Sequence, residues 1–239
     1  MKSENIEYRD GDTVCRGYLV WNETISGKRP GILVMPEALG LGPHAKARAE
    51  RLASLGYVAL AGDPYGNGLL LDDLQQAIAR ATQLMSTPGG FRARGRAALD
   101  RLAALPQVDP NRLGAIGFCM GGSFALELAR DGAPLKAVVG FHSGLQTQKP
   151  ATSQIKTKIL VCLGADDPLI PFDAVKAFEE EMTQAKADWQ VIHYGGTVHS
   201  FTNPEADRLG NPAIAYNRSA DERSWKSMRA LFDEVFTSN

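Results

Sequence analysis

The chain has 239 residues, and 44% of them are hydrophobic, so we expect one domain (1–239) with a large buried core. Its 26 basic and 27 acidic side chains give a formal net charge of −1, which argues against nucleic acid or an anionic membrane as a partner. No apolar run approaches the roughly 20 residues that span a bilayer. The polar residues 1–12 lack the apolar core of a secretory signal, so the expected location is the cytoplasm. The oligomeric state stays open.

Short apolar runs alternate with helical patterns along the chain, which predicts an α/β fold: a mostly parallel sheet with helices on both faces. The first predicted strand, at residues 13–21, is expected at the sheet edge. Ser219 and Glu222 fit a capping box at the start of the last helix. The predicted strands are 13–21, 31–35, 57–62, 112–118, 135–141, 158–164 and 189–195, and the predicted helices are 43–55, 71–86, 91–105, 120–130, 172–186 and 221–236.

Polar side chains follow many of these strands. Right-handed crossovers place the carboxyl ends of parallel strands along one edge of the sheet, where active sites of such folds lie. We therefore expect the residues that follow the strands to converge there: Glu37, Asp63, Cys119, His142, Asp167 and His199.

The three cysteines, Cys15, Cys119 and Cys162, are odd in number and widely spaced, which argues against a disulfide framework. None has a second cysteine or a histidine at zinc-site spacing, so neither a metal nor another cofactor is expected. A free thiol with a special role remains possible by this count.

Residues 117–122, GFCMGG, follow a predicted strand and open a helix. This is the G-x-S-x-G nucleophile elbow with cysteine in the place of serine. Such a turn exposes the sulfur of Cys119 at a helix N-terminus, which favours the thiolate, and directs the Met120 N–H toward a developing oxyanion. The alternative is a buried structural cysteine beside a glycine-rich helix start. A dinucleotide motif fits less well, because the spacing is not G-x-G-x-x-G.

An acid and a base follow Cys119 in the chain order that α/β-hydrolases use, with Asp167 after one strand and His199 after the last. His199 can act as the base, and Asp167 can orient it. Asp166 is the alternative orienting residue. Taken singly, His199 could be an ordinary loop histidine and the aspartates a solvated turn, but the order and the strand ends agree for all three residues.

The chain resembles the dienelactone hydrolase family over nearly its whole length. The resemblance implies an α/β-hydrolase fold with about eight strands, with Cys119, Asp167 and His199 as the triad. It also implies that Glu37 interacts with the thiol and helps to activate it when substrate binds, and that the Ala38 N–H is the second oxyanion donor. The motifs that carry it are MPEALG (35–40), GDPYGNG (62–68), GFCMGG (117–122), GADDPLIP (164–171) and VHSFTNP (198–204).

The sequence departs from this family after His199. Family members that act on dienelactone hold its carboxylate with arginines, one of them shortly after the catalytic histidine, but here no arginine occurs before Arg208. Residues 202–219 look like an added loop near the site, and Tyr216 and His142 are expected to line the pocket. The cations that could replace the missing arginine are Arg80, Arg92 and Arg94.

These observations predict a cysteine hydrolase of lactones or activated esters that forms a thioester acyl-enzyme. A thiolate leaves a tetrahedral intermediate more readily than an alkoxide or amine does, so esters with stabilised leaving groups suit it best. Two other functions stay open: a non-catalytic binding protein of the same fold, and a redox protein with a reactive Cys119. No resolving cysteine lies near Cys119 in the sequence, which weighs against the redox function.

Overall fold

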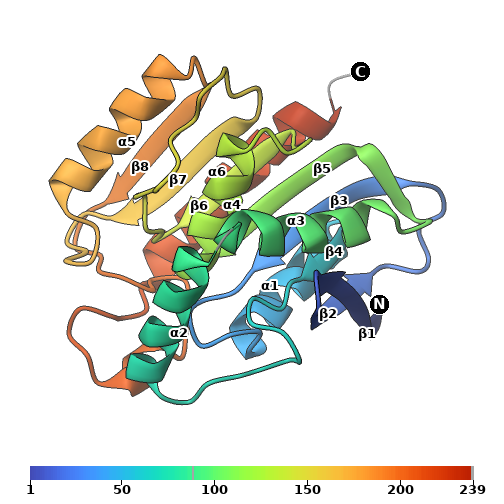
Figure 1. Ribbon diagram of the computed structural model, residues 1–239, viewed down its shortest axis with the longest axis horizontal. Helices are drawn as coiled ribbons and strands as arrows, with labels where there is room; N and C mark the ends of the chain where they lie inside the picture. Colours follow the sequence, from blue (N-terminus) through green and yellow to red (C-terminus); the bar gives the residue numbers. More distant parts are fainter. Residues whose placement is uncertain (88, 238–239) are drawn as a thin grey trace.

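The computed structural model describes residues 1–87 and 89–237 and contains an eight-stranded sheet (Figure 1). The two antiparallel pairs are β1 with β2 and β2 with β4, and the remaining neighbours are parallel. The predicted α/β class with about eight mostly parallel strands is therefore confirmed. In spatial order, the strands are β1 (Lys2–Asp10), β2 (Thr13–Trp21), β4 (Val58–Ala61), β3 (Arg29–Met35), β5 (Val108–Phe118), β6 (Ala137–Phe141), β7 (Lys158–Gly164) and β8 (Trp189–Tyr194).

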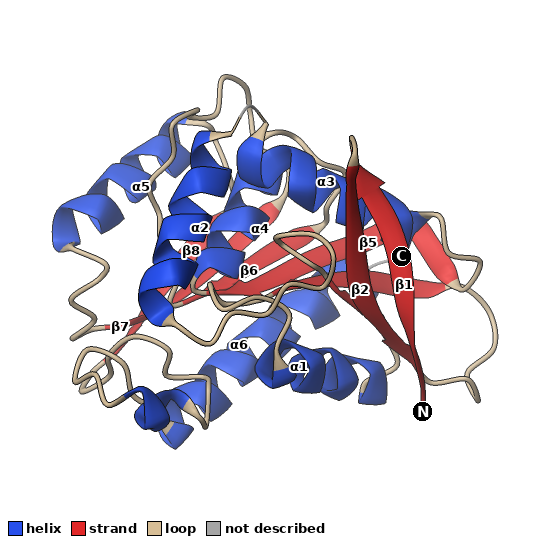
Figure 2. Cartoon of the chain, turned by 60° about the horizontal axis from the view of Figure 1, so that its bottom comes forward, coloured by secondary structure: helices blue, strands red, loops and turns tan. Residues whose placement is uncertain are grey.

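Helices cover both faces of the sheet (Figure 2). The helices α1 (Pro43–Ser54) and α6 (Arg218–Thr237) pack on one face. The opposite face carries α2 (Leu74–Ser86), α3 (Gly90–Ala103), α4 (Met120–Arg130) and α5 (Phe172–Gln184). Two apolar clusters, one for each face, bury the strands between these layers. None of the helices that the structure describes has the length and apolar character needed to cross a membrane.

The edge strand β1 was not predicted from the sequence, so β2 is the second strand and not the edge. In β1 only Ile6 and Tyr8 are buried, because the strand has a neighbour on one side only and exposes most of its side chains. Two buried positions among charged and polar ones give too weak an alternation to identify a strand.

The predicted capping box at the start of α6 is wrong. The helix begins at Arg218, and the side-chain oxygen of Asn217 accepts a hydrogen bond from the Ala220 N–H at 3.1 Å. Asparagine is as good a cap as serine, so Ser219 lies inside the first turn instead.

Candidate active site

Cys119 occupies the sharp turn between β5 and α4, with φ 53° and ψ −119°. This is a strained backbone conformation for a residue with a side chain. The turn is tight enough to require glycine around it: a methyl group at Gly117 would lie 1.9 Å from the Gly121 carbonyl oxygen, and one at Gly121 would lie 2.1 Å from the Met35 carbonyl oxygen. The Cys119 N–H donates to the carbonyl oxygen of Phe141 at 2.9 Å. The glycines of the motif are thus explained by packing, and the sulfur remains partly exposed.

His199 and Asp167 form a buried pair, with 2.7 Å between Nδ1 of His199 and Oδ2 of Asp167. The other carboxylate oxygen of Asp167 accepts the Leu169 N–H at 2.9 Å, which holds the acid in place. Asp166, the alternative, is exposed to solvent. Nε2 of His199 is buried and bonds to no other described residue, and both His199 and Cys119 line the same cavity.

The electrostatics of His199 favour its protonated form. Burial alone lowers the pKa of this histidine, but the nearby Cys119 sulfur and the Asp167 carboxylate outweigh burial and raise the pKa to about 10. An imidazolium beside a sulfur is the arrangement that stabilises a thiolate. The three residues that the sequence identified are therefore brought together in a geometry suited to nucleophilic chemistry.

Glu37 follows β3 and is held by the loop that carries His199. Ser200 Oγ donates to Oε1 of Glu37 at 3.0 Å, and Asn203 Nδ2 donates to Oε2 at 2.7 Å. Nδ1 of His44 lies 3.5 Å from Oε2. Burial raises the pKa of Glu37, but the neighbouring histidines and Ser200 outweigh it and lower the pKa to about 2. In the described parts of the chain no hydrogen bond joins Glu37 to Cys119, and the carboxylate is bound by Ser200 and Asn203 instead.

His142 lies behind Cys119, fully buried, with φ 41°. Its Nδ1 accepts the Cys119 N–H at 3.1 Å, so Nε2 carries the proton and donates to Thr202 Oγ1 at 2.9 Å. Burial, followed by the nearby His199, lowers the pKa of His142 well below its usual value. A neutral ring is what an acceptor at Nδ1 requires. His142 therefore supports the Cys119 turn and is not among the residues that line the cavity.

Ala38 and Met120, whose backbone amides were expected to hold an oxyanion, line the same cavity as Cys119. Neither amide has an acceptor within residues 1–87 and 89–237. The Tyr65 hydroxyl donates to the Ala38 carbonyl oxygen at 2.6 Å and so fixes this loop. Asp63 is structural: its buried carboxylate accepts the N–H groups of Gly66 and Gly68 at 2.8 Å each. These contacts explain why the motifs at 35–40 and 62–68 occur together.

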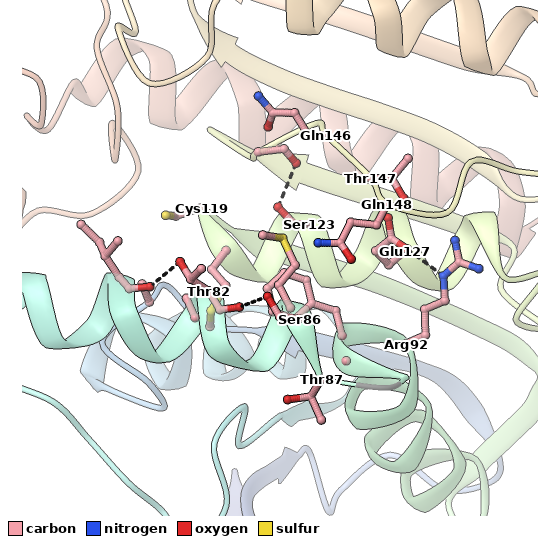
Figure 3. Close-up of a pocket in the computed structure, with 18 of the residues that line it drawn as sticks. Thr82, Ser86, Thr87, Arg92, Cys119, Ser123, Glu127, Gln146, Thr147 and Gln148 are labelled. Atoms are coloured by element: carbon pink, nitrogen blue, oxygen red, sulfur yellow. Dashed lines mark hydrogen bonds and ion pairs between the residues drawn. The ribbon is translucent and has the colours of Figure 1, made fainter.

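A cavity of about 740 Å³ extends from Cys119 and His199 between α2, the start of α4 and residues 144–149 (Figure 3). Tyr216, predicted to line the pocket, is not among its lining residues, and its hydroxyl instead donates to Asp221 at 3.3 Å. Nor does any residue of 202–219 line the cavity. This segment supports the histidine instead, because the His199 N–H donates to the Ala213 carbonyl oxygen at 3.0 Å.

None of the three candidate arginines offers a free cation to the cavity. Arg94 is buried and bonds to Asp10 at 2.8 Å. Arg80 is not a lining residue, and it bonds to Gln83 at 2.7 Å. Arg92 does line the cavity, but it is paired with Glu127 and Asp131.

Sequence reasoning missed the residues of α2 that form the cavity wall. Ile78, Thr82 and Met85 recur at helical spacing and line the cavity. The spacing was a usable signal, but it is the same pattern that a helix face packed on the core would show. Ile78 and Met85 are in fact 48% and 42% exposed.

Comparisons with known proteins find a matching family and similar structures. The sequence model of the dienelactone hydrolase family matches residues 15–236. A crystal structure of a dienelactone hydrolase-like promiscuous phosphotriesterase from metagenomic libraries is 45% identical, with a TM-score of 0.95 and 98% of each chain covered. A carboxymethylenebutenolidase from a Pseudomonas species is 28% identical over 77% of this chain and 82% of that protein. An α/β hydrolase from a deep-sea metagenome, 18% identical with a TM-score of 0.72 and 99% of each chain covered, shares the fold.

Proposed function

Since the chain belongs to the dienelactone hydrolase family, and is therefore a carboxylic ester hydrolase with the α/β-hydrolase fold, we propose that Cys119, His199 and Asp167 perform the hydrolysis through a thioester intermediate. The observation that carries this proposal is the buried 2.7 Å contact of His199 with Asp167, which leaves Nε2 in the cavity wall beside the strained Cys119 turn.

In the first half of the proposed reaction, the Cys119 thiolate attacks the ester or lactone carbonyl carbon. The carbonyl oxygen becomes an oxyanion that accepts hydrogen bonds from the N–H groups of Ala38 and Met120. The C–O bond then breaks, and the leaving oxygen takes the proton from Nε2 of His199. The acyl group remains on the sulfur as a thioester.

In the second half, Nε2 of the now neutral His199 takes a proton from water, and the resulting hydroxide attacks the thioester. Collapse of this second tetrahedral intermediate releases the carboxylic acid and restores the thiolate and the imidazolium. Asp167 holds the ring in one tautomer through both halves, because its carboxylate accepts the Nδ1 proton.

Glu37 takes a positioning role in this proposal. Its two oxygens are engaged by Ser200 and Asn203, and its pKa of about 2 makes it a poor acceptor for the thiol proton. We propose that it links the loop that carries His199 to the loop that carries Ala38. This link would keep the base and the oxyanion donor at a fixed position relative to each other.

The nature of the nucleophile narrows the substrate. A thiolate is a better leaving group than an alkoxide, so the tetrahedral intermediate of an alkyl ester tends to return to substrate. Aryl esters, enol esters and lactones with stabilised leaving groups avoid this return of the tetrahedral intermediate to substrate. A second candidate reaction is the hydrolysis of phosphotriesters. The 45% identical protein is a promiscuous phosphotriesterase, and its structure covers 98% of this chain.

The test is hydrolysis of 4-nitrophenyl acetate by the wild type and by Cys119→Ala, with intact mass measured after iodoacetamide. Turnover that is lost in the variant and blocked by a single alkylation supports the proposal. An alkylated but hydrolytically silent protein, or an inert thiol, would contradict it and favour the redox or binding function. Diethyl 4-nitrophenyl phosphate, assayed alongside, tests the second candidate reaction.

A further inference from the structure

The wall of the cavity opposite Cys119 contains an arginine that is paired with two carboxylates (Figure 3). Nε of Arg92 donates to Glu127 at 2.7 Å, and Nη1 donates to Asp131 at 3.1 Å. Nη2 donates to the carbonyl oxygen of Lys149. Two carboxylates thus surround one guanidinium, and the side chains of Arg92 and Glu127 are only 17% and 12% exposed. Three of its five N–H groups are used in this way, and a substrate anion would have to compete with two resident carboxylates for this cation.

The hydroxyl groups of the cavity are engaged in the same way. Thr82 and Ser86 donate to carbonyl oxygens of their own helix at 2.9 Å each, and Ser123 donates to the Gly144 carbonyl oxygen at 2.8 Å. A hydroxyl has one proton and two lone pairs. With the proton used internally, each of these groups presents only acceptor lone pairs to the cavity.

Thr147 is the exception among the lining hydroxyls, because its oxygen accepts the Lys149 N–H and its own proton has no acceptor among the described residues. It is partly exposed, and the other side-chain donors among the lining residues, Gln146, Gln148 and Lys149, are exposed. Water solvates them and weakens their attraction for an anion. The amides of Ala38 and Met120 are reserved for the reacting carbonyl oxygen in the proposed mechanism. Apart from the reacting groups, the described lining therefore offers mostly acceptors and an arginine already paired with two carboxylates, so a carboxylate, which is acceptor-only when ionised, meets no unpaired buried cation.

We infer that this cavity selects uncharged substrates and rejects those that carry a carboxylate on the part that enters it. The inference rests on the proposed hydrolase function and makes its substrate class specific. An anion would lose its hydration without gaining an unpaired buried cation, which is the costly case of polar burial. A neutral group with N–H or O–H donors, such as a primary amide, meets the lone pairs of Thr82, Ser86 and Ser123 instead.

The experiment compares three acyl chains of equal length: 4-nitrophenyl hexanoate, mono-4-nitrophenyl adipate, and the primary amide of that adipate ester. We expect kcat/KM for the carboxylate, corrected for spontaneous hydrolysis, to be lower than for the isosteric amide by about tenfold or more. 4-Nitrophenyl acetate and 3-carboxy-4-nitrophenyl acetate make the same comparison on the leaving-group side. Discrimination in either series supports the inference and identifies the part of the substrate that enters the cavity.

A carboxylate substrate that reacts as well as its neutral partner in both series would overturn the inference while leaving the hydrolase function intact. No turnover of any substrate would contradict the hydrolase function and the inference together. These outcomes need only the wild-type protein, so they do not depend on the folding of a variant.

Glu127→Gln tests the cause, because it removes one of the two charges that neutralise Arg92 at nearly constant shape. The ratio of carboxylate to amide kcat/KM should rise at least about threefold in Glu127→Gln, and Arg92→Gln added to it should abolish the gain. Asp10→Asn is the matched control, because Asp10 pairs with Arg94 at 2.8 Å and neither residue lines the cavity. Its ratio should stay that of the wild type, and an equal rise in both single variants would contradict the role of Arg92.

Discussion

The region behind Cys119 and the cavity in front of it differ in the range of their hydrogen bonds. Behind the sulfur, side chains far apart in sequence bond to one another, as His142 does to Thr202 and Ser200 to Glu37. In front, the hydroxyls of α2 bond within the helix, Thr82 to the carbonyl of Ile78. Cys119 itself, and His142 and Ser200 behind it, are non-glycine residues with a strained, positive φ.

This difference separates the chemistry from the choice of substrate. Behind Cys119, hydrogen bonds between distant parts of the chain hold the proposed reacting groups in a strained backbone conformation. Each of these hydrogen bonds depends on several others. In α2 only Ala77 is buried, so few side chains of this helix contribute to the packing of the core. Changes behind the sulfur should therefore damage catalysis and stability, while changes in front should mainly alter which substrate is accepted.

The largest expected effect is that of Cys119→Ala. Removing the nucleophile should lower kcat for 4-nitrophenyl acetate by about 10³-fold or more. Circular dichroism checks that the variant is folded. Retention of a tenth or more of the activity would show that another group attacks.

The next effect separates two neighbouring aspartates. Asp167→Asn should lower kcat by roughly 10²- to 10⁴-fold, because an amide cannot hold His199 in the working tautomer as the carboxylate does. Asp166→Asn changes an exposed side chain one residue away and should leave kcat within about twofold of wild type. Equal losses in the two variants would be incompatible with a specific role for Asp167.

Glu37 supplies a prediction about pH. Its pKa is lowered to about 2 in the folded protein, so its contribution to stability is present above the unfolded value near 4.5 and is lost as the pH falls toward 2. At pH 7, Glu37→Gln should cost on the order of 1–3 kcal/mol in free energy of unfolding, and the difference from wild type should shrink by pH 3. Urea unfolding at both pH values measures this, with the exposed Glu23→Gln as control. A pH-independent difference would count against the carboxylate network.

The smallest effects come from one substitution made on each side of the sulfur. Thr202→Val leaves the buried Nε2 proton of His142 without an acceptor and should cost about 1–3 kcal/mol. Thr82→Val removes a hydroxyl bonded within an exposed helix and should change stability by about 0.5 kcal/mol or less, acting mainly on KM. Similar costs in thermal unfolding for both variants would remove the distinction between the two regions.

The sequence predicted the parts of the fold that have a strong local signal. The helix at 120–130 and the strand at 158–164 have the predicted boundaries, because continuous apolar runs and flanking glycines mark them. The edge strand β1 exposes most of its side chains and gave no such signal.

Within the candidate site, chain order and strand ends were enough to select Cys119, Asp167 and His199 as residues that the fold brings together. The partners of Glu37 were not predictable, since Ser200 and Asn203 reach it only through the fold. The cavity was missed for a related reason. A helix pattern does not say whether its apolar stripe packs on the core or faces a space, and whether Arg92 is free depends on Glu127 and Asp131.

The most direct test of the thioester mechanism is to trap the acyl-enzyme. The wild type is mixed with 4-nitrophenyl acetate, quenched in acid during turnover and mapped by peptide mass spectrometry. We expect one acetyl group on the peptide that contains Cys119, removable by neutral hydroxylamine as a thioester is. An acetyl group confined to a different residue, or turnover with no acylated Cys119 at any quench time, would contradict the mechanism.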